Sequence, residues 1–181
     1  MTTITIDALS ADSLSKAADR VRKLARAIAN KNHDFVKDLA KVGTDEMKMA
    51  LSEDAQPGFP NEQEDMPSYN NPHVLSGGEY GKAQATLKLS GPNALFVEFG
   101  AGVYHNGPVG SSPHPLGTEL GYTIGSYGQG HGKDEYWHYT KDGNEHISHG
   151  TKALMPMWRA SQAIRQEAKA KAKSSFNIKG I

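Results

Sequence analysis

Histidine is the residue type in this sequence with the most obvious capacity for chemistry. The chain has eight histidines, and six of them fall between residues 105 and 149: His105, His114, His131, His138, His146 and His149. A zinc ion needs three or four converging ligands, and the chain offers no cysteine and no His-Glu-x-x-His spacing. We therefore expect polar loop or interface histidines and no bound metal. The alternative is a metal-dependent hydrolase that uses the 105–149 region together with Glu98.

Glu98 is the second candidate, because it is the single carboxylate in the densest apolar run of the chain, residues 94–102. Flanked by Phe96, Val97 and Phe99, it could be desolvated, as a general acid requires. No second carboxylate or histidine stands at a spacing that defines a catalytic pair. We expect instead that Glu98 is a structural anion, bound by backbone N–H groups of the following glycine-rich turn or by an arginine of a neighbouring subunit.

The glycine-rich segments are the third candidate. Residues 128–132 contain Gly-x-Gly but lack the full dinucleotide-binding pattern, and no Gly-Lys-Ser/Thr phosphate loop follows. The Gly-x-Ser-x-Gly elbow of serine hydrolases is also missing. We expect no cofactor and no catalytic residue.

A short helix is the element favoured for the run that carries Glu98. Pro92 and Asn93 precede it and Gly100 follows it, which are the residue types typical of a helix start and a helix end. A buried strand is the alternative, because so short an apolar run does not settle the period. In the helix, Leu95, Phe96 and Phe99 would share one face and Glu98 would point elsewhere.

Two longer helical regions bracket the rest of the chain. Apolar residues recur at helical spacing through residues 12–52, which predicts two helices, or one long helix that breaks or bends near residues 30–34. The last helix is expected to begin at Met155-Pro156-Met157, with proline in its first turn, and to run to about residue 175.

Alternation of polar and apolar residues predicts three strand regions. Residues 2–6 suggest a short strand and residues 82–89 a half-buried one. The Asp142-Gly143 pair between aromatic and β-branched runs predicts a hairpin. A two-residue turn there would pair Tyr139 with His146 and His138 with Ile147.

Two segments read as loops within a single domain of 181 residues. Residues 53–80 are acidic and rich in proline, which predicts a loop or arm outside the core. Residues 102–134 are rich in glycine and have no helical period, which predicts an extended functional loop or one ordered by other subunits. Together these elements indicate an α+β fold: a small, mostly antiparallel sheet packed by an N-terminal helical region and a C-terminal helix, with long loops.

Charge is balanced overall but not along the chain. The chain has 20 Lys and Arg against 20 Asp and Glu, which argues against non-specific nucleic-acid binding. Residues 45–65 carry seven acidic residues and one lysine, and residues 151–181 carry seven basic residues and one glutamate. Pairing of these unlike segments between copies could close a ring. No signal-like or membrane-spanning run is apparent, so we expect a soluble product made in the cytoplasm.

The order of motifs resembles a known family. An N-terminal helical region and an alternating strand precede Phe96-Val97-Glu98-Phe99-Gly100-Ala101-Gly102, and a Ser112-Pro113-His114-Pro115 loop follows. Next come Gly125–Gly132, Tyr136-Trp137-His138-Tyr139 and Ala153-Leu154-Met155-Pro156-Met157-Trp158. This series resembles the tail-component (neck or tail-completion) family of tailed bacteriophages, over most of residues 12–173. Ala101 stands where the family usually has threonine, and the start of the last helix is a looser version of the family's Pro-Phe-Met pattern.

The resemblance implies a structural virion protein at the head–tail junction that forms rings and has no catalytic activity. Its expected partners are further copies of itself, neighbouring neck, head-completion and tail-tube proteins, and passing DNA without sequence specificity, but no membrane. The expected location is the virion tail or neck, assembled in the host cytoplasm. The residues implied in folding or assembly are Phe96, Glu98, Phe99, Gly100, Gly102, Trp137, Tyr139, Met155, Pro156 and Met157.

Overall fold

The computed structural model describes residues 10–52, 67–77, 81–102, 114–117, 119–120, 137–148, 150–151 and 153–176. Contacts divide the chain into two compact units. The first comprises Met1–Val42, Asn71–Leu87 and Ala163–Ile181, and the second comprises Gly43–Asn70 and Lys88–Gln162.

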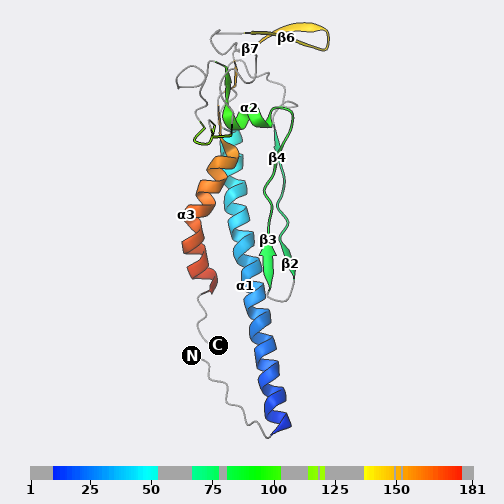
Figure 1. Ribbon diagram of the computed structural model, residues 1–181, viewed down its shortest axis with the longest axis vertical. Coiled ribbons are helices and arrows are strands. Elements are labelled where there is room, and N and C mark those ends of the chain that lie inside the picture. Colours follow the sequence, from blue (N-terminus) through cyan, green and yellow to red (C-terminus); the bar gives the residue numbers. More distant parts are fainter. Residues whose placement is uncertain are drawn as a thin grey trace. The chain divides into compact units, whose positions relative to one another are not determined.

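Three helices and eight short strands are described, which confirms the α+β prediction (Figure 1). In chain order they are α1 (Ala11–Ser52), β1 (Ser68–Tyr69), β2 (Leu75–Gly77), β3 (Lys82–Gln84), β4 (Leu89–Ser90), α2 (Ala94–Phe99), β5 (Ala101–Gly102), β6 (Trp137–Lys141), β7 (Asn144–Ser148), β8 (Gly150–Thr151) and α3 (Pro156–Phe176). The strands form four two-stranded antiparallel sheets, β1–β4, β2–β3, β5–β8 and β6–β7, in place of the one small sheet expected. In the described part of the chain, no helix is long and apolar enough to cross a bilayer.

Helix α1 is a single helix of 42 residues. Its first turn is capped by Ser10, whose Oγ accepts a hydrogen bond from the Ser13 N–H at 3.3 Å. Residues 30–34, where a break or bend was considered, lie inside the helix. The polar run there ends no helix because it contains neither proline nor glycine.

The first unit packs the β2–β3 hairpin and the C-terminal turns of α3 along α1 (Figure 1). Gly81 leads into β3 with φ +62°, and a Cβ placed on it would lie 2.6 Å from the Ala29 Cβ. Only glycine therefore permits this approach of the hairpin to the helix. Asn32 donates to the Gly81 carbonyl at 3.2 Å, and on the α3 side Phe35 meets Phe176 edge-on at 5.6 Å.

The half-buried strand predicted at residues 82–89 is confirmed in its alternation. Ala83, Ala85 and Leu87 are partly buried, and the residues between them are exposed. Regular strand geometry is limited to β3 and β4, whose partners β2 and β1 lie in the segment predicted as a loop. Val74 in that segment is buried. The proline content of this segment favoured a loop prediction. Prolines that lie outside a ladder do not prevent strand pairing, so the short strands were missed.

The second unit holds the largest fully buried side chains of the described residues, which are Met47, Val97 and Pro156. They come from α1, α2 and α3, so each of the three helices contributes a fully buried side chain to this unit. At its margin the Arg159 Nε donates to Glu46 Oε1 at 2.8 Å. This pair of partly buried side chains ties the first turns of α3 to α1.

The β6–β7 hairpin confirms the predicted turn and register. Tyr139 pairs with His146 and His138 with Ile147. Asp142 and Gly143 both have positive φ, 54° and 78°, as a type I′ turn requires. Other predictions fall on residues that the structure does not describe: the strand at 2–6, most of the 53–80 loop and most of the 102–134 loop.

Candidate functional site

Helix α2 places Glu98 in the interior of the second unit. Its turn begins when the Val97 N–H donates to the Asn93 carbonyl at 3.0 Å, although the Asn93 side chain does not cap the helix. Val97, Glu98 and Phe99 are buried, and Leu95 is exposed. The short helix was predicted, but the expected orientation was wrong: the carboxylate points inward and Leu95 points outward.

Helix α3 begins without a residue that could cap it. Met155 occupies the N-cap position, since its carbonyl accepts the first helical bond, from the Arg159 N–H at 2.9 Å. Its side chain has no oxygen to offer, and its φ of 54° lies in the left-handed region. Pro156 follows as the first helical residue and has no N–H. Two free N–H groups remain at the next two positions, those that a capping side chain usually binds.

Glu98 binds both of these N–H groups. The Met157 N–H donates to Glu98 Oε2 at 2.8 Å, and the Trp158 N–H donates to Oε1 at 2.8 Å. The carboxylate therefore caps α3 from a distance of about 60 positions in the sequence. Its negative charge also lies at the positive end of the helix macrodipole, an arrangement worth up to about 2 kcal/mol in partly buried sites.

His114 supplies the third contact of the carboxylate. Its Nε2 lies 3.2 Å from Glu98 Oε1, and its Nδ1 accepts the Leu116 N–H at 3.0 Å. Because Nδ1 accepts, the proton of the neutral ring is assigned to Nε2, which then donates to the carboxylate. The ring contacts Phe99 at 4.5 Å and Trp158 at 5.4 Å between centroids.

The backbone of α2 adds a reciprocal connection. The Val97 carbonyl at the C-terminal end of α2 accepts the Leu154 N–H at 2.9 Å and the Met155 N–H at 3.3 Å. The end of α2 thus supplies a carbonyl that has no partner within its own helix, and the start of α3 supplies N–H groups that have none within theirs. Each helix end therefore satisfies hydrogen-bonding groups at or next to the other. Gly100 closes α2 with φ 77° and ψ 161°, a combination essentially restricted to glycine. We call this set the Glu98 junction: Val97, Glu98, Gly100, His114 and the Leu154–Trp158 segment.

The Glu98 junction contains a carboxylate and an imidazole, as a catalytic acid–base pair does, but neither group has an atom directed at a substrate-accessible space. Both carboxylate oxygens accept backbone N–H groups, and both ring nitrogens of His114 take part in hydrogen bonds. Only 7% of Glu98 and 5% of His114 is exposed to solvent. A general base must reach a substrate proton, and a metal ligand must direct a lone pair at the ion. In this arrangement both groups stabilise the fold.

The residues implied in folding or assembly fall into three groups. Phe96, Glu98, Phe99, Gly100, Met155, Pro156 and Met157 lie in or beside the Glu98 junction. Gly102 pairs with Gly150 in the β5–β8 sheet. Trp137 and Tyr139 lie on β6, paired with Ser148 and His146. The structure therefore brings the first group together and does not place the other residues in the same hydrogen-bonded set.

Sequence reasoning missed the partners of Glu98, which were expected in the adjacent glycine turn or in a neighbouring subunit. Backbone N–H groups do bind the carboxylate, but they belong to α3. A signal was present: no Ser, Thr, Asp or Asn stands directly before Pro156, so the helix start needed an acceptor from elsewhere. His114 gave no comparable signal, because a histidine between two prolines fits many loops.

The histidine cluster is not assembled in the described residues. His138 and His146 lie exposed on the β6–β7 hairpin, and His114 is buried in the Glu98 junction. Within the described ranges, no group of three His, Asp or Glu side chains could hold a metal ion. His105, His131 and His149 lie outside those ranges.

Comparison with known proteins adds no relative. A scan of protein families, a search of curated proteins and a search of solved structures found no match to this chain.

Proposed function

We propose that this protein is a structural virion subunit of a tailed bacteriophage. In this proposal it forms a ring at the head–tail junction, at the neck, tail-completion or tail-terminator level, and is needed for tail assembly and joining. Its partners are further copies of itself, the adjacent neck, head-completion and tail-tube proteins, and the DNA that passes through the ring. The protein catalyses no reaction.

One observation carries the proposal: the two most recognisable motifs of the resemblance meet in the Glu98 junction. Phe96-Val97-Glu98-Phe99-Gly100 and Leu154-Met155-Pro156-Met157-Trp158 are about 60 positions apart, yet they share four hydrogen bonds. Motifs whose polar groups are engaged in joining two helices favour a structural protein over an enzyme. Among structural proteins, the sequence resemblance supports a phage neck or tail-completion subunit.

The hydrolase alternative gains no support from the described residues. It requires Glu98 as the acid or base, and that carboxylate is buried and accepts two helix N–H groups and the His114 Nε2–H. Elemental analysis of protein purified without a histidine tag tests it directly. We expect less than stoichiometric zinc, manganese or iron, and a stoichiometric metal would favour the hydrolase.

The proposed function is tested by joining. Heads and tails made in the absence of this chain are mixed with the purified protein, and joined particles are counted by negative-stain electron microscopy. We expect joined particles only when the folded protein is added. An antibody against this protein should label the joined particles at the neck or at the end of the tail. A protein that stays monomeric and also fails to join or complete these particles would contradict the proposal.

A further inference from the structure

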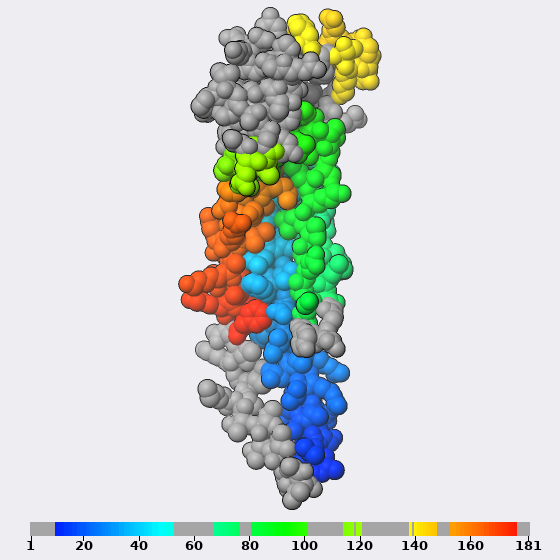
Figure 2. Space-filling model, viewed as in Figure 1, coloured from blue at the N-terminus to red at the C-terminus, as the bar shows by residue number. Residues whose placement is uncertain are grey.

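Helix α1 carries one apolar stripe, and only part of it is covered within the first unit. From Ala29 onward the helix is flanked by the β2–β3 hairpin and by α3, with contacts at Ala29, Asn32 and Phe35. Lys31 donates to the Ser175 carbonyl at 2.8 Å on the α3 side. In Figure 2 the hairpin and α3 flank the middle of α1, and the blue turns that precede them lie at the surface.

The turns formed by residues 11–28 leave large apolar side chains exposed. Leu14 is 47% exposed, Val21 is 55% exposed and Ile28 is 39% exposed. These three residues are seven positions apart, so they lie along one line on the helix with a drift of about 20° per step. Between them Leu24 is half-buried, and the small Ala17 side chain is buried at 7% exposure. We call this line the α1 stripe; these turns extend roughly 27 Å at 1.5 Å per residue.

Apolar residues spaced seven positions apart on a helix are typical of a face that packs against another surface. Isolated exposed apolar residues need no explanation, but three large ones that recur along one line of a helix are typical of a contact surface. The same face of α1 is used for packing in the turns that follow, which shows that the pattern is a packing pattern there. The exposed part of the face has the chemistry to receive another protein surface.

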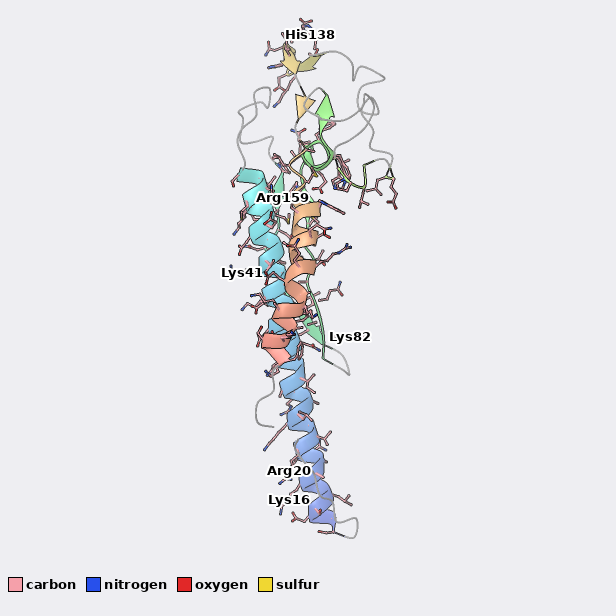
Figure 3. All side chains as sticks on the ribbon, turned by 90° about the vertical axis from the view of Figure 1, so that its left-hand side faces the viewer. Lys16, Arg20, Lys41, Lys82, His138 and Arg159 are labelled. Atoms are coloured by element: carbon pink, nitrogen blue, oxygen red, sulfur yellow. The ribbon has the colours of Figure 1, made fainter. Side chains whose placement is uncertain are left out.

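Charge indicates which surface that is. Residues 11–28 contain five Lys and Arg against two Asp, and Arg20 and Arg22 border Val21 on both sides. Lys16 and Arg20 lie on these turns in Figure 3. Over the whole first unit the sequence has 14 basic and 7 acidic residues, and over the second unit it has 6 basic and 13 acidic residues. A neutral chain is thus composed of a unit of net +7 and a unit of net −7.

We propose that the α1 stripe docks on the acidic second unit of another copy of this chain. The acidic unit offers exposed apolar side chains for the stripe, at Met49, Leu95 and Leu120. Unlike surfaces then meet head to tail. The copy that docks with its stripe keeps its acidic unit free, and its partner keeps its stripe free, so further copies can add at both ends. This inference deepens the proposed ring by naming the surface, and it rests on that proposal only in taking a second copy as the occupant.

Self-association of the full chain tests the stripe. Sedimentation velocity over a range of protein concentrations should show assembly that weakens as salt rises, because the Debye length falls from about 8 Å at physiological salt to about 3 Å at 1 M. Val21→Asp should weaken association by about tenfold or more, as loss of a central apolar anchor does. Ser15→Asp introduces the same charge on an exposed position away from the stripe, and should change association by less than about threefold, since a rim charge contributes little.

A second variant protects the test against misfolding. Replacing Leu14, Val21 and Ile28 together by alanine removes the stripe and raises helix propensity. This variant should keep the circular dichroism of the wild type and lose self-association. Retained association in both the alanine variant and Val21→Asp would overturn the proposal, as would a wild-type chain that stays monomeric at every concentration and salt.

A mixing experiment separates head-to-tail docking from pairing of two stripes. The Val21→Asp chain still has an intact acidic unit, so it should bind fluorescently labelled wild-type protein, although it does not assemble alone. If two stripes pair with each other, Val21→Asp will fail to bind the labelled chain, which would overturn the proposal. Binding of the stripe to DNA or to anionic lipid vesicles without self-association would overturn it as well.

These outcomes remain distinct from a failure of the proposed function. If the protein joins heads to tails but does not associate through the stripe, the proposed function stands and the docking inference is wrong. If it associates through the stripe but never joins phage particles, the docking inference stands and the proposed function is wrong.

Discussion

The Glu98 junction and the α1 stripe use polar and apolar side chains in opposite ways. In the junction the Glu98 carboxylate is buried. Its described hydrogen bonds go to two N–H groups at the start of α3 and to His114. In the stripe, apolar side chains suited to a core stay exposed to solvent. Residue type alone therefore does not separate a catalytic group from a structural one. What matters is whether the fold itself uses the group or leaves it available.

Replacing Glu98 by glutamine should produce the largest effect. Glutamine has one oxygen for the N–H groups of α3 and His114, and its amide donor would face another donor in a buried site. We expect the free energy of unfolding to fall by about 3 kcal/mol. Urea denaturation measures this change.

The matched control for this variant is Glu119→Gln, which removes the same charge from an exposed position of the same unit. It should change the unfolding free energy by no more than about 0.5 kcal/mol. If Glu98→Gln kept its stability and its assembly but lost a chemical activity, the structural role of the junction would be refuted.

Gly81→Ala should produce the next largest effect and tests the covered part of α1. The new Cβ would lie 2.6 Å from the Ala29 Cβ at a residue with φ +62°. Backbone strain and overlap together should cost about 2 kcal/mol, again measured by urea denaturation. Gly143→Ala is the control, because Gly143 has φ +78° but open space around it. An equal loss in both variants would show that the close approach of the hairpin to α1 contributes nothing.

His114→Phe isolates the nitrogen atoms of the ring. Phenylalanine can keep the contacts with Phe99 and Trp158 but cannot donate to Glu98 or accept the Leu116 N–H. We expect a loss of about 1.5 kcal/mol in thermal unfolding. His114→Gln can donate to the carboxylate and should recover part of that loss. No loss in His114→Phe would reduce the histidine to a packing residue.

Val21→Asp should have the smallest effect on stability and so provides the sharpest contrast with Glu98. An exposed substitution on a helix surface changes the unfolding free energy by no more than about 0.5 kcal/mol. Urea denaturation at a concentration where the wild type is monomeric gives the value. A loss similar to that of Glu98→Gln would mean that the stripe is covered within its own chain, and the comparison would then fail.

Local features of the sequence predicted much of this structure. Asp142 and Gly143 suffice to define the hairpin turn, and the turn defines the register that pairs Tyr139 with His146. Likewise Pro156 marks the start of α3, and Gly100 marks the end of α2. Each of these predictions depends on interactions within a few residues, which a linear pattern contains.

The environment of Glu98 could not be read in the same way. Its partners are 16, 59 and 60 positions away, and no spacing rule relates such positions. The strand at residues 68–69 was missed for the same reason, since Ser68 pairs with Ser90. The strand at residues 75–77 pairs locally with β3 and was missed because the proline-rich composition of residues 53–80 favoured a loop. The part of the candidate site that was predictable is its need for an acceptor at α3, because Met155 cannot cap a helix.

The amino-acid pattern alone predicts that the N-terminal helical region carries an apolar stripe along one face and that residues 45–65 and 151–181 have opposite net charge. The tertiary structure decided which turns of that stripe are covered, because the covering residues come from β2–β3 and α3. It also decided that Glu98 faces inward, since a carboxylate on a short helix can be buried only where N–H groups converge on it. Periodicity is a property of the chain, and burial depends on what the fold brings to each face.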